Sequence, residues 1–345
     1  MRQTIAGSRP GQAGGIVAPW RNPIMRRTRF LLCIVAILVV SSPSIRGQET
    51  AQQQFREGYR QEQQGQFTAA IACIEAAVDA DGLSHAEKGK AWILLGYAYK
   101  ETGQYQKSQT AYERALSIFT GDSDHLGDYA NTLNDFAGLY RSTGRAKEAE
   151  GLWTRALNVY RQLDDHRGMV QVYANLAGMA LEQRHLRAAQ DAIAKAVAET
   201  KSANRLSDDD LSLVSEVQGW ILSTRGDNVS AIADYRQVVD LRRQGHGEYF
   251  PLTGWAYLIL GRAYVANGQT EEALSNIRTG LDILDRTEGR QTPRYLAGEV
   301  IYSQALEQTG LHEEAARLKT SAQQSLRELY RSQCLGCTVS ASSFR

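Results

Sequence analysis

The sequence has few of the residues that interrupt helices: only six of its 345 residues are proline. Proline breaks a helix interior, so its scarcity leaves room for long uninterrupted helices. Alanine, leucine, glutamine, glutamate and arginine dominate, and all of them favour the helical conformation. Hydrophobic residues make up 43% of the chain, which excludes global disorder and is enough for a packed core.

A dense basic stripe is also lacking. The net charge of +1 hides an asymmetry, because residues 1–47 hold seven of the 39 basic residues and no acidic residue. The rest of the chain has 32 basic against 38 acidic residues, a net charge of −6. Phosphate binding needs clustered lysine and arginine, so nucleic acid is not an expected partner.

Catalytic signatures are missing as well. The sequence contains no nucleophile elbow, phosphate-binding loop, zinc-protease helix or dinucleotide fingerprint. Its six histidines are far apart, and most of them fall in turns or between repeats, whereas a metal site needs several converging ligands. The sequence therefore predicts no enzyme activity, no cofactor and no metal.

The N-terminal segment, residues 1–47, is typical of a secretory signal. A basic cluster at 25–29 precedes an unbroken apolar run at 30–40 and a short polar stretch ending at Gly47. Eleven apolar residues form a helix of about 16 Å, short of the ~30 Å of a bilayer core. We expect cleavage after Gly47 and a periplasmic or secreted protein. The alternative is that the segment stays uncleaved as a membrane anchor, which would be the only expected membrane contact. Met1 and Met25 are both candidate initiators.

A repeat pattern is the strongest signal. Trp92-Ile-Leu-Leu-Gly-Tyr-Ala-Tyr99 is followed by Gly103-Gln-Tyr105 and by Ala111-Tyr-Glu-Arg-Ala115. This pattern resembles the tetratricopeptide repeat (TPR), with Ser108 in place of the usual alanine. The longer spacing, near 42 residues, and the stretch Thr132–Tyr140 resemble the kinesin light chain type. The resemblance implies an all-α, right-handed superhelical solenoid of antiparallel helix–turn–helix repeats.

Turn glycines recur at intervals of 38, 41, 82, 42 and 42 residues. The interval of 82 residues contains one further turn, which has Arg184-His185-Leu186 in place of glycine. This spacing predicts about seven units in a solenoid at 48–330, with a C-terminal tail at 331–345. The turn glycines are Gly65, Gly103, Gly144, Gly226, Gly268 and Gly310. The units lie near 51–84, 89–122, 130–163, 170–203, 212–245, 254–287 and 296–329.

Small residues stand seven positions before and five positions after each turn, for example Gly96 and Ser108 around Gly103. Two helices approach to 8–10 Å only where neither side chain is bulky, so these positions predict the helix–helix contacts. Aromatic residues in a fixed repeat phase, such as Tyr112 and Trp153, are interpreted as core. Thr292 before Pro293 predicts a helix start.

The resemblance implies a scaffold whose first helices line a concave groove for an unidentified protein or peptide partner. We expect Asn131, Asn134, Arg141 and Asn175 to bind it, the asparagines pairing with its backbone and Arg141 selecting an acidic group. Asn134 and Asn175, 41 residues apart, are expected to be equivalent. The opposing interpretation is that these are ordinary solvated residues.

Cys334 and Cys337 form a Cys-x-x-Cys motif in the tail. In an exported protein such a pair is a candidate disulfide, within the chain or between two chains. The alternative function is therefore an exported thiol–disulfide protein, or a structural subunit of an envelope assembly, that uses this pair. Cys73, on the second helix of the first unit, is predicted to be a small core residue.

Overall fold

The computed structural model describes residues 43–333. The chain divides into two units, residues 1–46 and residues 47–345, and the second holds nearly all of the described residues. The predicted signal segment therefore lies almost wholly outside the described residues, and Cys334 and Cys337 lie wholly outside them. No helix in residues 43–333 is long and apolar enough to span a bilayer.

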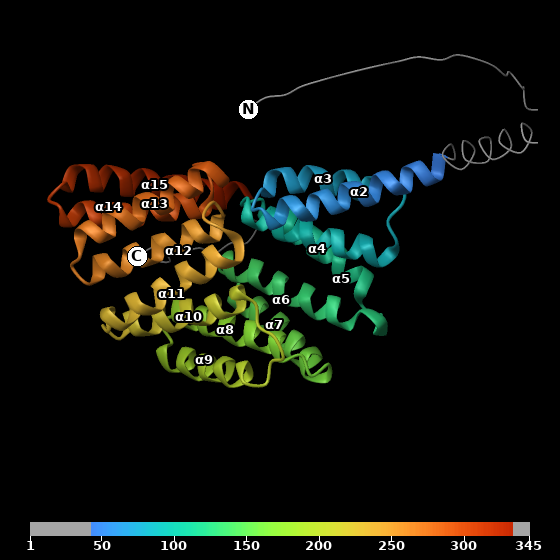
Figure 1. Ribbon diagram of the computed structural model, residues 1–345, viewed down its shortest axis with the longest axis horizontal. Helices are drawn as coiled ribbons and strands as arrows, with labels where there is room; N and C mark the ends of the chain where they lie inside the picture. The colour runs from blue at the N-terminus through green and yellow to red at the C-terminus, as the bar shows by residue number, and fades with distance from the viewer. Residues whose placement is uncertain (1–42, 334–345) are drawn as a thin grey trace, which may run out of the picture. The chain divides into compact units, whose positions relative to one another are not determined.

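Between residues 43 and 333 the regular structure is helical throughout, with fourteen α-helices and one short 3-10 helix, Ser123–His125. Consecutive helices pair into seven hairpins (Figure 1). The helices are α2 (Pro43–Gln63), α3 (Phe67–Asp79), α4 (His85–Glu101), α5 (Tyr105–Phe119), α6 (Leu126–Ser142), α7 (Ala146–Gln162), α8 (His166–Glu182), α9 (Leu186–Thr200), α10 (Asp208–Thr224), α11 (Asn228–His246), α12 (Pro251–Ala266), α13 (Thr270–Thr287), α14 (Pro293–Gln308) and α15 (His312–Gln333). The predicted all-α solenoid of seven helix–turn–helix units is confirmed.

The predicted turns close the hairpins. Each of the six turn glycines has a positive φ, between +70° and +84°, a region that a residue without a Cβ atom enters without steric cost. The remaining turn has Arg184 at φ +62°, so an arginine takes the left-handed conformation there. The predicted helix start is confirmed too, because α14 begins at Pro293 and the Thr292 side chain accepts a hydrogen bond from the Tyr295 backbone N–H.

The small residues lie where the paired helices touch. A Cβ atom added to Gly96 on α4 would come within 2.6 Å of the Tyr112 ring on α5. The Ser108 hydroxyl donates a hydrogen bond of 2.6 Å to the Gly96 carbonyl oxygen. Gly58, Gly219 and Gly261 meet the second helices of their own hairpins in the same way. The spacing of small residues therefore predicted the helix–helix contacts correctly.

Most of the predicted core aromatics are buried, with Trp153, Tyr112 and Tyr235 fully enclosed. Trp92, Tyr140, Tyr173 and Tyr257 are only partly buried and pack at the edges of the core clusters. Cys73 was wrongly predicted: it is a free, partly exposed thiol, because its position on α3 turns away from the core side of that helix.

Successive first helices contact one another, α4 with α6, α6 with α8, α8 with α10 and α12 with α14. Each of these first helices also packs against the second helix of its own hairpin. The surface of the first helices that faces away from the second helices is called the inner face below.

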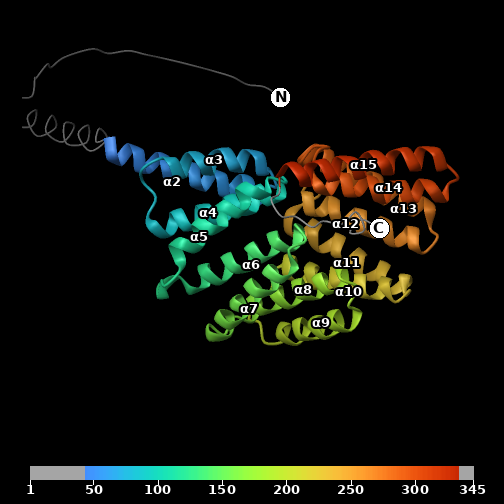
Figure 2. The ribbon, with the colours of Figure 1, turned by 180° about the vertical axis from the view of Figure 1, so that it is seen from behind.

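The curvature brings the last hairpin back to the first two. In both views the α14–α15 hairpin lies next to the ends of α2, α3 and α4 (Figures 1 and 2). Arg294 at the start of α14 forms ion pairs with Glu288 and with Glu101, which is 193 residues away on α4. The Tyr105 and Tyr330 rings stack with centroids 5.4 Å apart. These five residues are called the seam.

Candidate functional site

The four residues predicted to bind a partner lie on α6 and α8, in the third and fourth hairpins. Asn131 is exposed, and its Oδ1 accepts a hydrogen bond of 2.8 Å from the Tyr160 hydroxyl. Asn134 is 8% exposed, and its Oδ1 accepts a hydrogen bond of 3.0 Å from the Trp153 indole N–H. Both amides are therefore anchored to the second helix of their own hairpin.

Asn134, Asn175 and Arg141 come together in one network. The Asn175 Nδ2 donates to the Asn134 Oδ1 at 3.5 Å, and the Arg141 Nη1 donates to the Asn175 Oδ1 at 3.4 Å. Arg141 also forms an ion pair with Glu182 on α8, with Nε and Nη2 at 3.0 and 2.8 Å from the Glu182 Oε1. The structure places Asn131 outside this network, and the sequence analysis missed Glu182.

Asn134 and Asn175 are not equivalent positions. The turn residues that close the two hairpins, Gly144 and Arg184, are 40 residues apart, whereas the two asparagines are 41 residues apart. The equivalent of Asn175 is therefore Asp135, one residue after Asn134. The prediction failed because a shift of one residue turns a side chain by about 100° around a helix.

Two glycines mark the inner face of the same helices. Gly138 on α6 and Gly178 on α8 are also 40 residues apart and occupy equivalent positions. The Arg141 side chain lies across Gly178, where an added Cβ atom would be 2.6 Å from the Arg141 Nη2. Over Gly138, no described atom outside the α6 backbone lies within 4 Å of the position of an added Cβ atom. We call Asp135, Gly138, Asn175 and Gly178 the glycine floor.

Asp135 is the unusual charge of the glycine floor. It is partly buried, and no hydrogen bond or ion pair joins its carboxylate to any residue that the structure describes. Burial raises the pKa of Asp135 to about 6; the Lys100 ammonium opposes this shift, and the Glu62 and Glu101 carboxylates add to it. These three charges belong to the first helices α2 and α4. Asp135 also lies near two second-helix tyrosines: burial raises the pKa of Tyr112 on α5 and of Tyr160 on α7, and the Asp135 charge adds to both shifts.

Asp135, Gly138 and Gly178 were missed in the sequence analysis. The signal was available, since Asp-x-x-Gly at 135–138 and Asn-x-x-Gly at 175–178 stand one repeat apart. Glycine in a helix interior destabilises it by about 0.5–1 kcal/mol relative to alanine. Gly138 is a mid-helix glycine that meets no other helix among the described residues, and it therefore indicates a surface where close approach matters.

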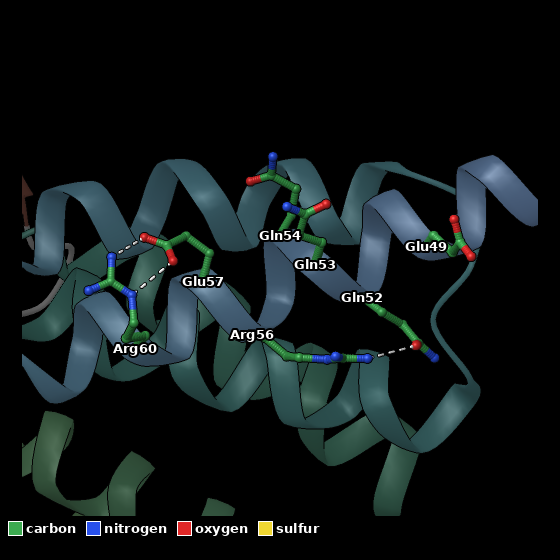
Figure 3. Close-up of a pocket in the computed structure, with 7 residues that line it drawn as sticks. All are labelled: Glu49, Gln52, Gln53, Gln54, Arg56, Glu57 and Arg60. Carbon is green, nitrogen blue, oxygen red and sulfur yellow. Dashed lines mark hydrogen bonds and ion pairs between the residues drawn. The ribbon is translucent and has the colours of Figure 1, made fainter. Parts of the chain in front are cut away.

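A separate hollow runs along α2 and is lined by residues of this helix alone. Figure 3 shows their side chains spreading to several sides of the helix, with Arg60 paired to Glu57 and Arg56 to Gln52. Because these charged groups satisfy one another and do not converge, the hollow offers no organised binding site. The lining residues are Glu49, Gln52, Gln53, Gln54, Arg56, Glu57 and Arg60.

Groups of three or more potential metal ligands do not occur in the part of the chain that the structure describes. The predicted disulfide candidates, Cys334 and Cys337, lie outside that part, and their pairing stays a prediction. The glycine floor is thus the best candidate site within residues 43–333, and its groups are suited to hydrogen bonding and ion pairing.

Comparison with known proteins identifies the repeats. Residues 55–123 and residues 128–198 each match a family model described as tetratricopeptide repeat, and together they span the first four hairpins. No curated protein matches the sequence.

Solved structures resemble the chain in fold. A Rap conjugation gene regulator of the plasmid pLS20, in complex with the Phr* peptide, is 14% identical, with a TM-score of 0.64 over 80% of this chain and 73% of that chain. Aspartyl phosphate phosphatase F from Bacillus subtilis is 13% identical, with a TM-score of 0.63 over 92% and 80%. A Rap protein complexed with competence and sporulation factor is 13% identical, with a TM-score of 0.52 over 83% and 97%. At these identities the likeness concerns the fold alone.

Proposed function

We propose that this chain, which is a tetratricopeptide-repeat protein, is a non-catalytic scaffold that binds an extended segment of a partner protein on its inner face. The observation that carries the proposal is the open helix surface at Gly138. A glycine there weakens α6 without serving a helix–helix contact in residues 43–333, since no atom outside the α6 backbone in that range lies within 4 Å of an added Cβ atom. A bound backbone that comes close to the helix would explain its presence.

The fold supports the same proposal. Two solved structures that share it are described as complexes, one with the Phr* peptide and one with competence and sporulation factor. A solenoid of stacked hairpins presents an extended curved surface, which suits an extended ligand.

The asparagines would provide the contacts to the partner backbone. The hydrogen bond between Asn175 and Asn134 is long, at 3.5 Å, so the Asn175 amide can turn toward a bound chain without losing a strong interaction. Asn131 is exposed, and its Nδ2 group forms no hydrogen bond with the residues that the structure describes. An amide both donates and accepts, so it pairs with a peptide backbone of any sequence.

Site-specific photocrosslinking tests the proposal. The photoreactive residue p-benzoylphenylalanine replaces Gly138 in the full chain, and it replaces Gly151 on α7 in the control. Both are helical glycines for which no described atom outside their own helix backbone lies within 4 Å of an added Cβ atom, but Gly151 lies on a second helix. We expect a crosslinked partner from position 138 and none from position 151. Equal crosslinking from both positions, or from position 151 alone, would contradict binding on the inner face.

We further propose that the protein is exported. The support is the order of residues 25–47, where a basic cluster precedes an apolar run and a polar stretch. N-terminal sequencing of the protein from fractionated cells tests this. A mature chain that begins at Gln48 in the periplasm or medium is expected, whereas a soluble cytoplasmic chain that begins at Met1 or Met25 would overturn the proposal.

A further inference from the structure

The third and fourth hairpins present the same pattern on their inner faces. Asp135 and Gly138 on α6 correspond to Asn175 and Gly178 on α8, one repeat of 40 residues later. In the fourth hairpin, the Arg141 side chain fills the space over the glycine of this pattern. Its guanidinium crosses Gly178, and its Nη1 lies 3.4 Å from the Asn175 Oδ1. A planar cation therefore fits the space above the glycine, next to a side-chain oxygen.

In the third hairpin no described side chain takes this place. Among the described residues, no atom outside the α6 backbone lies within 4 Å of a Cβ atom added to Gly138, and the Asp135 carboxylate has no ion-pair or hydrogen-bond partner. The equivalent of Arg141, one repeat of 41 residues earlier, is Lys100. Its Nζ is instead 2.9 Å from the Glu101 Oε1. The chain's own cation is thus held by another carboxylate.

The two hairpins also differ in the charge of the oxygen. Asn175 offers a neutral amide to a guanidinium that Glu182 already neutralises, with the Arg141 Nη2 at 2.8 Å from the Glu182 Oε1. Asp135 offers a full carboxylate. Burial raises its pKa to about 6, and the Lys100 ammonium offsets only part of this shift. A cation bound there would remove this penalty.

Resting on the proposed function, we infer that Asp135 and Gly138 form a pocket for an arginine side chain of the bound segment. The carboxylate accepts hydrogen bonds from the guanidinium, whose flat face rests on the helix at Gly138 as that of Arg141 rests at Gly178. Arginine is favoured over lysine because a guanidinium is planar, less strongly hydrated and able to donate two parallel hydrogen bonds.

This inference reverses the sign of the expected partner charge. The sequence analysis assigned selectivity to Arg141 and therefore an acidic group to the partner. Arg141 is paired with Glu182, whereas Asp135 is unpaired among the described residues, so the charge open to a partner at this point is negative.

Three synthetic decapeptide libraries test the inference. They are randomised at all positions but the fifth, which is arginine, its neutral isostere citrulline, or glutamate. Binding is measured by competition on immobilised full-length protein, for the wild type, for Asp135→Asn and for the control Asp128→Asn. Asp128 lies on the same helix and pairs with Lys90 at 3.6 Å, away from the glycine floor. Circular dichroism checks that both variants are folded.

We expect the wild type and Asp128→Asn to prefer the arginine library to the citrulline library by about tenfold or more, because a hydrogen-bonded charge pair contributes more than a neutral contact. Asp135→Asn should bind both libraries equally. Binding without a charge preference, or a preference that Asp135→Asn retains, would overturn the arginine pocket and leave the scaffold function standing. If the wild type binds none of the libraries, the peptide-binding function fails as well.

Discussion

The seam and the glycine floor both place charged residues on or near the inner face. The charges of the seam are paired with one another, whereas the Asp135 carboxylate of the glycine floor is unpaired among the described residues. In the seam, Arg294 lies between Glu101 and Glu288, whose side chains are 7% and 3% exposed. Burial opposes ionisation, yet Arg294 and Lys100 lower the pKa of Glu101 to about 2. On the glycine floor, Asp135 has no such partner among the described residues, and its pKa is raised. In the seam, paired charges join the last hairpin to the first two. On the glycine floor, the unpaired carboxylate is available to a ligand.

Glycine shows the same contrast. At Gly96 the missing side chain lets two helices of one hairpin touch, with the Tyr112 ring against the backbone. At Gly138 no other helix of the described chain comes within 4 Å of an added Cβ atom. One residue type thus contributes to stability at a helix–helix contact and opens a surface on the inner face. Four substitutions, two of charged residues and two of glycines, test these two contrasts.

The largest effect is expected in the seam. Arg294→Met would leave the buried Glu288 carboxylate without its ion-pair partner and would leave Glu101 with Lys100 alone. Breaking a buried ion pair from one side costs about 3–5 kcal/mol. Urea unfolding followed by circular dichroism should show this loss. The control is Arg290→Met, which removes an exposed pair with Asp285 and should change the free energy of unfolding by less than ~1 kcal/mol. Equal effects of the two variants would show that the seam does not hold the ends together.

Gly96→Leu comes next. The new side chain would collide with the Tyr112 ring, which an added Cβ atom already approaches to 2.6 Å. Overpacking of this kind costs about 1–3 kcal/mol, and neighbouring hairpins share the loss because each stabilises the next. The melting temperature should therefore fall, in a transition that involves more than one hairpin. An unchanged melting temperature would contradict the close contact.

Asp135→Asn should stabilise the protein at neutral pH. The folded pKa of Asp135 is about 6, above its ordinary value of 3.8, so the folded state holds more protons between these pH values. The free energy of unfolding of the wild type therefore falls as pH rises through this window. Relative to Asp135→Asn, the wild type should lose about 1–2 kcal/mol between pH ~4 and pH ~7, with partial exposure reducing the full effect. Parallel pH profiles of the two proteins would be the contrary result.

The smallest effect on stability is expected at Gly138. Leucine is a better helix former than glycine, and no atom stands in its way, so Gly138→Leu should raise the free energy of unfolding by about 0.5–1 kcal/mol. Gly151→Leu on α7 should do the same. Only Gly138→Leu should abolish binding of the partner captured by crosslinking, measured by calorimetry. Retained binding would place the partner away from the glycine floor.

The sequence alone determined the hairpins. Turn residues, paired small residues and phased aromatics repeat at about 40 residues, and each acts on neighbours within one or two units. Contacts such as Ser108 with Gly96 follow from this local pattern, because two helices joined by a short turn have few ways to pack. The position of the site on α6 and α8 could also be approached from the sequence, through Asn131, Asn134, Arg141 and Asn175.

Only the tertiary structure decided which charges are free. Arg294 contacts Glu101, 193 residues away, because small rotations between successive hairpins add up until the last hairpin meets the first two. The total rotation cannot be read from the sequence of any single repeat. In the same way, Arg141 crosses to Gly178 while its counterpart Lys100 turns to Glu101. Equivalent positions in the sequence thus have different partners in space, and this difference leaves Asp135 without a partner in the described chain and open to a ligand.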